Sequence, residues 1–321
     1  MTTQGLFVGV AAGLASALLF AGLVTQSPMA LGLSLAAPIP ILIASLGWGS
    51  VPGFVAAAAS ALLIGLISET PATALVLLAS VAVPAAVVGH LCGLARPREE
   101  RTGRAIEPAN DGGQIPLDWY PVERILFAIA ILAAGGTIVI GWLVGFDQET
   151  MAPILREALT APGGPAIDAT PEQLEDLAQL VVGIVPFVQP AVFVMNLVAT
   201  LYLAAAVTRM SGRLQRPRDD VPSQTSLPRV ALPVFAISLA ASFLGGTLGL
   251  LGAVVAGALG MAFTLVGLAA FHQRSRGRAA RGLLLFTVYF AIVVLTFPLF
   301  VFLLYGVFAT ARPAPGPGGT R

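Results

Sequence analysis

Two amide side chains stand inside an otherwise apolar stretch of this 321-residue chain and could bind a polar ligand. Gln189 and Asn196 are seven residues apart, so a helix would place both on one face. Amides inside an apolar helix either hydrogen-bond a ligand or hold neighbouring helices together. The sequence leaves both interpretations open, and we treat the two amides as candidate ligand-binding residues.

Two prolines form a second candidate site, in the motif Pro38-Ile39-Pro40-Ile41. Each proline removes a backbone donor and leaves a carbonyl without its helical partner. At membrane depth such carbonyls are tolerated only when they are buried in protein or line a cavity. Interrupted helices of this kind build binding sites in many transporters, and the alternative is a kink that serves packing alone. We therefore include Pro38 and Pro40 among the candidate ligand-binding residues.

Most catalytic and cofactor chemistry has no counterpart in the sequence. The predicted span interiors contain no Asp, Glu, Lys or Arg, and neither an H-E-x-x-H motif nor a phosphate-binding G-x-x-x-x-G-K-[ST] loop occurs. His90 and Cys92 are only two residues apart, so they point to different faces of a helix. We expect no catalytic residue, no metal site and no cofactor, and we predict that the protein is not an enzyme.

The composition indicates whether the chain is a soluble protein or a membrane protein. The chain is 57% hydrophobic and only 10% charged, whereas soluble proteins carry about 25% charged residues. This excludes an ordinary soluble enzyme, a secreted disulfide scaffold, a disordered protein and a nucleic-acid-binding protein. The sequence predicts an all-α, polytopic transmembrane helical bundle whose first partner is the lipid bilayer.

The apolar stretches divide into about nine predicted spans, since a helix needs about 20 apolar residues to cross the hydrocarbon core. Turn signals such as Thr25-Gln26-Ser27-Pro28 and Gly47-Trp48-Gly49-Ser50 separate the first three spans. The spans are expected near 6–24, 30–47, 51–68, 72–95 and 125–146, within 177–208, twice within 230–273, and once between Arg281 and Arg312.

The arginines predict the orientation of these spans. All 17 basic residues are arginine, and 14 of them fall in the segments 96–124, 209–229 and 274–281. Positive residues near span ends stay cytoplasmic, whereas the segment 147–176 has seven acidic residues against Arg156 alone. We expect the N-terminus inside and the C-terminus outside a bacterial inner membrane. A re-entrant segment 30–47 would move the N-terminus outside.

Four regions follow from this division. They are a four-span membrane unit at 1–95, a cytoplasmic linker at 96–124, a five-span membrane unit at 125–311 and a disordered tail at 312–321. The second unit contains an external amphipathic segment at 147–181, which is either a packed hairpin or a lid. There Thr170-Pro171-Glu172-Gln173 predicts a capped helix start, and a second helix is expected at 148–159.

Small residues recur at a spacing of four in three predicted spans. Such ridges let helix backbones approach closely, either within the chain or against a partner protein. The ridges are Gly9, Gly13, Ala17 and Ala21, then Gly53, Ala57, Ala61 and Gly65, and finally Gly252, Ala256 and Gly260.

Two motifs resemble the YybS-like family of bacterial inner-membrane proteins, a family of unknown function. The first is Ala37-Pro38-Ile39-Pro40-Ile41 with the Gly47-Trp48-Gly49 turn. The second is Gly267-Leu268-Ala269-Ala270-Phe271-His272, followed by an arginine loop and a final span around Tyr289 and Pro298. The YybS-like family is distantly similar to the substrate-binding components of energy-coupling-factor vitamin transporters. That similarity implies a nutrient site between helices and a docking role for the ridge that begins at Gly9.

These observations lead to two expectations. The first is a solute-binding or transport-related membrane protein, with a small-molecule ligand in a cavity between the second, fourth and sixth spans. Pro38, Pro40, Gln189 and Asn196 would line that cavity. The alternative is a scaffold that does not transport and that packs against a membrane-protein partner of an envelope complex through its small-residue ridges.

Overall fold

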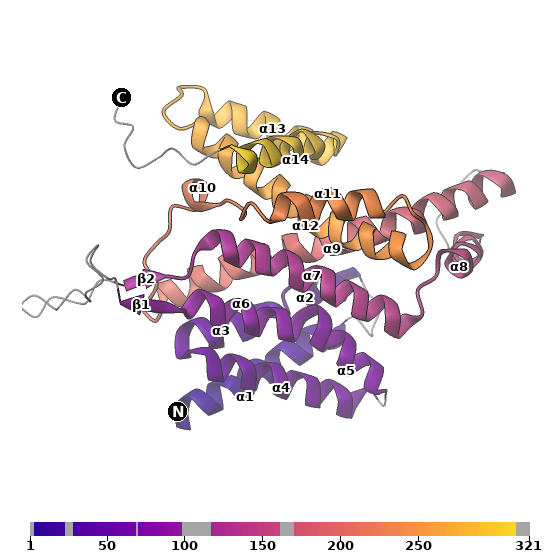
Figure 1. Ribbon diagram of the computed structural model, residues 1–321. Helices are drawn as coiled ribbons and strands as arrows, with labels where there is room; N and C mark the ends of the chain where they lie inside the picture. The colour runs from indigo at the N-terminus through magenta and orange to yellow at the C-terminus, as the bar shows by residue number, and fades with distance from the viewer. Residues whose placement is uncertain (1–2, 23–27, 69, 98–116, 161–169, 313–321) are drawn as a thin grey trace, which may run out of the picture. The chain divides into compact units, whose positions relative to one another are not determined.

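The computed structural model describes residues 3–22, 28–68, 70–97, 117–160 and 170–312. Within these ranges the chain is almost entirely helical, with one short pair of strands, which confirms the predicted all-α class (Figure 1). Six helices are long and apolar enough to cross a membrane, which is compatible with a multi-pass membrane protein. They are α1 (Thr3–Ala21), α4 (Ser50–Ile67), the run from α5 (Pro71–Leu77) to α6 (Val83–Gly93), α7 (Val122–Val144), α9 (Pro171–Met210) and α12 (Gly246–Arg274).

Three of the nine predicted spans form shorter helices. The second is divided into α2 (Pro28–Leu35) and α3 (Pro38–Trp48), and the seventh is the 11-residue α11 (Ala231–Ala241). The ninth is divided into α13 (Arg281–Leu295) and α14 (Pro298–Ala311), which are bent by 118° and would make a seventh span if counted as one. Thr296 has a φ of 57° at that bend. A total of nine crossings therefore stays a prediction.

Packing divides the chain into two compact units. The first contains residues up to Ile129 together with Asn196–Pro228, and the second contains Ala130–Met195 together with the chain from Arg229 onward. In the first unit, α1 packs along α4, and α3 packs against α1, α4 and α6. Figure 1 shows these four helices side by side.

The break between α2 and α3 lies where the sequence places Pro38 and Pro40. Neither proline can donate a backbone hydrogen bond, and the amides of Ala37 and Ile39 instead form tight turns to Ser34 and Ala36. The carbonyl of Ala37 accepts a hydrogen bond from the buried Ser16 hydroxyl of α1 at 2.7 Å. The interruption is therefore satisfied inside the protein at this carbonyl.

A second irregularity lies in the fourth apolar segment. Between α5 and α6 the chain forms one π-helical turn, η2 (Leu78–Ala82), in which the Val83 amide bonds to the Leu78 carbonyl. Pro84 follows immediately, and its ring would clash with the Ser80 carbonyl in a regular α-helix. The wider π turn accommodates that ring, which is the physical reason for the irregularity.

The ends of the predicted cytoplasmic linker pair with each other. Strands β1 (Ala95–Pro97) and β2 (Leu117–Trp119) are antiparallel, with Arg96 opposite Asp118, and the Tyr120 amide bonds to the Leu94 carbonyl at 2.9 Å. The residues between the strands lie outside the described ranges, as do the tail residues 313–321. The first unit also contains the short α10 (Val221–Gln224).

The predicted capped helix start is confirmed in the second unit. The Thr170 amide donates to the Gln173 side chain at 2.8 Å, and the Gln173 amide donates to the Thr170 hydroxyl at 3.3 Å. The helix that begins here is α9, which continues for 40 residues, so the last part of the amphipathic segment and the sixth span form one element. The expected second helix is α8 (Gln148–Thr160), and its Arg156 pairs with Glu175 at 3.3 Å.

The glycines of the ridges serve packing inside the chain. A methyl group placed on Gly9 would lie 2.7 Å from the Pro52 carbonyl oxygen of α4, and one on Gly13 would overlap the Ala56 carbonyl. In the second unit, Gly252 faces Ser238 and Ser242 around α11 in the same way. Ala17, Ala57 and Ala256 are buried, whereas Ala21, Ala61 and Gly65 are partly exposed.

A close helix crossing in the second unit joins α12 to α14. A methyl group on Gly306 would overlap the Phe263 carbonyl, and one on Gly267 would overlap the Phe302 carbonyl. The rings of Phe271 and Phe302 pack edge to face beside this crossing, with centroids 5.6 Å apart. Two glycines on facing helices therefore bring the two backbones into contact.

Candidate functional site

A pocket of about 200 Å³ lies within the first unit. It forms where α3 ends and α4 begins, beside the last turn of α6, strand β2 and the segment that follows α9. These are the ends of the second, fourth and sixth apolar segments of the sequence. The lining residues are 45–50, 92–93, Trp119 and 214–216.

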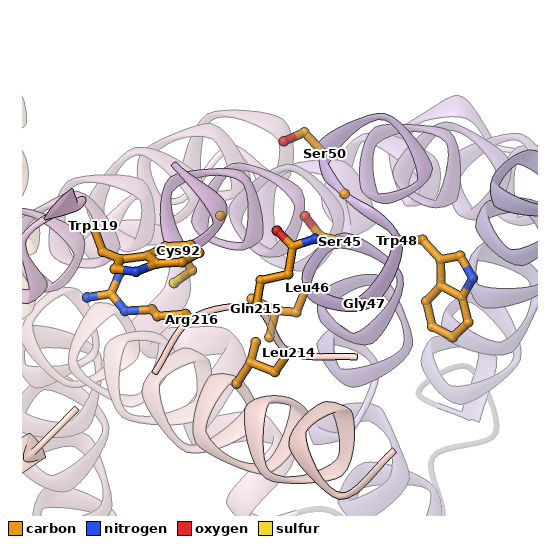
Figure 2. Close-up of a pocket in the computed structure, with 12 residues that line it drawn as sticks. Ser45, Leu46, Gly47, Trp48, Ser50, Cys92, Trp119, Leu214, Gln215 and Arg216 are labelled. Carbon is orange, nitrogen blue, oxygen red and sulfur yellow. The ribbon is translucent and has the colours of Figure 1, made fainter. Parts of the chain in front are cut away.

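The pocket has a buried floor and an exposed rim. Ser45 and Cys92 are 3% and 7% exposed, whereas Gly49, Gly93 and Gln215 are exposed. Figure 2 shows the Gln215 side chain pointing toward Ser45, and the Trp48 ring pointing away from the other labelled residues. Ser45 and Cys92 therefore lie on the buried side of the pocket.

Ser45 occupies the point where three helices cross. A methyl group on Gly53 of α4 would lie 2.7 Å from the Ser45 Cβ, and one on Gly89 of α6 would lie 2.6 Å from it. The two glycines thus leave room for this one side chain. The Ser45 hydroxyl makes no hydrogen bond, although a buried polar group without a partner costs about 1–3 kcal/mol. The hydroxyl oxygen itself lies between the two glycines with almost no exposed surface, although Ser45 is one of the residues that line the pocket.

Arg216 forms the charged wall of the pocket and is held from outside it. Its Nε donates to Asp219 Oδ2 at 2.6 Å, and its Nη1 donates to the Tyr120 carbonyl at 3.0 Å. The Arg216 side chain is only 11% exposed, and Figure 2 shows its guanidinium beside Trp119. These contacts fix the guanidinium in place before any ligand binds.

Two further interactions surround the pocket. The Arg213 guanidinium lies 4.4 Å from the centre of the Trp48 ring, which ties the segment after α9 to the turn between α3 and α4. Ser50 and His90 share a hydrogen bond of 2.6 Å between Oγ and Nδ1. The His90 ring also lies 6.0 Å from the ring of Phe54. His90 therefore packs at the side of the pocket and is not among its lining residues.

None of the four predicted ligand-binding residues lines this pocket. Pro38 is fully buried and Pro40 is partly buried, both in the first turn of α3. Gln189 and Asn196 are both partly buried on α9, but Gln189 belongs to the second unit and Asn196 to the first. The structure thus brings together the ends of the expected segments, but with different residues from those predicted.

The residues that the sequence reasoning missed are Ser45, Gln215 and Arg216. Serine is common in apolar helices, and Arg216 reads as one of many cytoplasmic arginines. The available signal is the Gly47-Trp48-Gly49-Ser50 turn, which in the sequence marks a boundary between spans and a family resemblance but no binding site. A turn with two glycines around a tryptophan also lets other segments approach closely.

Across the described parts of the chain, no three His, Cys, Asp or Glu side chains lie close enough together to hold a metal ion. No family model, curated protein or solved structure matches the chain. The functional argument therefore depends on the geometry of this pocket.

Proposed function

We propose that this chain is a multi-pass protein of a bacterial inner membrane that binds a small solute and serves as a component of a transport system. The observation that carries the proposal is the pocket built around Ser45 and Arg216. Most of the chain is apolar, and buried polar groups in such a protein are costly unless they are used. A pocket lined by an arginine and by a buried serine without a hydrogen-bond partner supports solute binding.

The interrupted helices near this pocket support the same proposal. The break between α2 and α3 and the π turn η2 both lie in helices that lead to the pocket. Irregular helical turns are frequent at functional sites, and transporters use interrupted helices to bind their substrates. The resemblance to the YybS-like family points in the same direction and stays a prediction.

The alternative scaffold function has less support from the packing. That function depends on small-residue ridges that are free to dock a partner, but Gly9 and Gly13 are covered by α4 and Gly53 is covered by Ser45. These glycines are used to assemble the chain itself. Solute binding is therefore the function that we favour.

A thermal-shift screen of the purified protein in detergent tests the proposal. We expect at least one compound from a panel of vitamins and water-soluble lipid precursors to raise the melting temperature in a concentration-dependent way, since a ligand at 100 times its Kd stabilises by about 2.7 kcal/mol. Gln215→Leu should weaken that response, whereas the matched control Gln224→Leu, an exposed residue outside the pocket, should keep it. The thermal-shift response of an Asn196→Leu variant tests whether this candidate ligand-binding residue contributes to binding. A panel without any stabilising compound would count against solute binding.

A further inference from the structure

We infer that the pocket around Ser45 binds a small oxyanion, a phosphate or carboxylate group, and that Arg216 is its principal ligand. This inference rests on the proposed solute-binding function and specifies the chemistry of the solute. It follows from the charge of the pocket, the orientation of Arg216, the free hydroxyl of Ser45 and the volume of the cavity.

The charges of the lining favour an anion. Among the described lining residues, Arg216 is charged and no residue is acidic. The segment from Arg209 to Asp220, which supplies one wall, carries four arginines and two aspartates and thus a formal charge of +2. Burying a cation beside Arg216 would bring like charges together at low dielectric. A bound anion would instead balance the surplus positive charge.

Arg216 keeps donors with which it could bind an anion. A guanidinium has more N–H donors than its contacts to Asp219 and Tyr120 use. Those contacts occupy Nε and one donor of Nη1, which leaves both donors of Nη2, and Arg216 itself lines the pocket. Arginine recognises carboxylate and phosphate through two parallel hydrogen bonds, and a guanidinium that is already fixed loses little entropy when it does so.

Ser45 would supply a second donor at the floor of the pocket by rotating its hydroxyl away from Gly53 and Gly89. Its hydroxyl has no partner in the protein, and the residue is 3% exposed. The glycines at positions 53 and 89 make the space that it occupies. A hydroxyl can donate to an anionic oxygen, so a ligand would remove the cost of leaving this group unpaired.

The volume limits the ligand to a small group. Pockets that hold a whole drug-sized molecule measure about 300–1,000 Å³, and this one measures about 200 Å³. It suits a phosphate or carboxylate group with a few attached atoms. Because the pocket lies at the ends of apolar helices, that group could belong to a free solute or to the headgroup of an anionic lipid.

Cys92 gives a direct readout of occupancy. It is the only cysteine in the chain and it lines the pocket. The rate at which a small uncharged thiol reagent modifies Cys92 therefore reports on access to the floor. We expect inorganic phosphate, compared with chloride at equal ionic strength, to slow the modification of the detergent-solubilised protein.

The variants separate the role of Arg216 from general charge. Arg216→Gln should weaken phosphate protection by about tenfold or more, the loss expected for a charge-assisted hydrogen bond. Arg218→Gln changes the same charge at an exposed residue outside the lining and should leave protection unchanged. The double variant Arg216→Gln/Asp219→Asn removes both partners of the ion pair, so that loss of protection cannot be attributed to an unpaired aspartate.

Ser45→Ala provides a variant that should fold. It should weaken phosphate protection several-fold without lowering the melting temperature of the free protein. If the pocket is a lipid site, phosphate will have little effect, whereas nanodiscs containing phosphatidylglycerol will protect Cys92 more than nanodiscs of phosphatidylcholine alone. That protection should depend on Arg216 in the same way, and the result would assign the oxyanion to a lipid headgroup.

Two results would overturn the inference, and they can be told apart. If a neutral compound protects Cys92 equally in the wild type and in Arg216→Gln, and no anion protects it, the solute-binding function stands and the oxyanion does not. If neither the compound panel, nor phosphate, nor anionic nanodiscs protect Cys92 or raise the melting temperature, both proposals fail.

Discussion

Two helix crossings in this protein use glycine for opposite purposes. In the second unit, Gly267 and Gly306 bring the backbones of α12 and α14 into contact, and phenylalanine rings pack beside them. In the first unit, Gly53 and Gly89 face a serine side chain that they leave room for. The α12–α14 crossing is a contact between backbones and aromatic rings, whereas the crossing in the first unit places a serine beside a pocket.

The difference teaches that a small-residue pattern does not reveal its own purpose. The two crossings differ in the group that lies opposite the glycines. It is a backbone carbonyl between α12 and α14, and it is the Ser45 side chain in the first unit. A buried hydroxyl is stable in an apolar bundle when it bonds to its own helix, as Thr264 does to the Gly260 carbonyl at 2.8 Å. The Ser45 hydroxyl has no such bond.

The largest effect is expected from Gly306→Leu. The new side chain would overlap the Phe263 backbone, which cannot move aside as a flexible side chain can. Overpacking typically costs about 1–3 kcal/mol and occasionally more, and we expect this variant to exceed that range and to yield little folded protein. Size-exclusion chromatography in detergent measures the loss. Gly282→Leu, at a glycine with open space around it, should elute as the wild type does.

A smaller loss is expected from Gly89→Ala. Its methyl group would lie 2.6 Å from the Ser45 side chain, so we expect a cost of about 1–3 kcal/mol in the free energy of unfolding. Removing the obstruction with Ser45→Gly should recover part of that loss, and thermal melting of the two single variants and the double variant measures the coupling. Purely additive losses would contradict the crossing that we describe.

Two hydroxyl deletions should have opposite signs. Thr264→Val removes a satisfied hydrogen bond and should lower the free energy of unfolding by about 0.5–1.5 kcal/mol. Ser45→Ala removes a hydroxyl without a partner and should leave the free protein equally stable or slightly more stable. Melting temperatures of both variants in ligand-free buffer compare them. A marked loss in Ser45→Ala would mean that its hydroxyl already has a partner.

The smallest effect is expected at the turn between α3 and α4 in the first unit, where Arg213 lies over Trp48. A cation–π contact at an exposed site contributes about 0.5–1 kcal/mol, so Arg213→Gln should lower the melting temperature slightly. Arg209→Gln provides a control with the same change of charge. Equal melting temperatures in the two variants would show that the contact adds no stability.

Much of the fold could be predicted because its causes are local. Apolar length set the positions of the helices, and the Thr170–Gln173 capping box set the start of α9. The π turn was missed, although Pro84 provided a signal, because a proline more commonly only bends a helix. The sharp bend at Thr296 also has a local signal in Pro298, which begins α14, but a proline does not reveal the size of a bend.

The site could be predicted only by region. The ends of the second, fourth and sixth apolar segments do meet at the pocket, but amides and prolines drew attention to the interior of the helices. Ser45 and Arg216 are ordinary residues in sequence, and the role we assign them depends on what lies opposite them in three dimensions. The spacing of residues along α3 cannot reveal that the Ser45 hydroxyl lacks a hydrogen-bond partner on α4 and α6.

The hydrogen bond from Arg216 to the Tyr120 carbonyl also constrains how the chain is threaded through the bilayer. Two residues that touch near helix ends are expected on the same side of the bilayer, so we expect the 95 residues between them to cross it an even number of times. The same parity holds between Trp48 and Gly93, which line one pocket. These contacts therefore predict that the four chain positions share one side of the bilayer, independently of the distribution of positive charge.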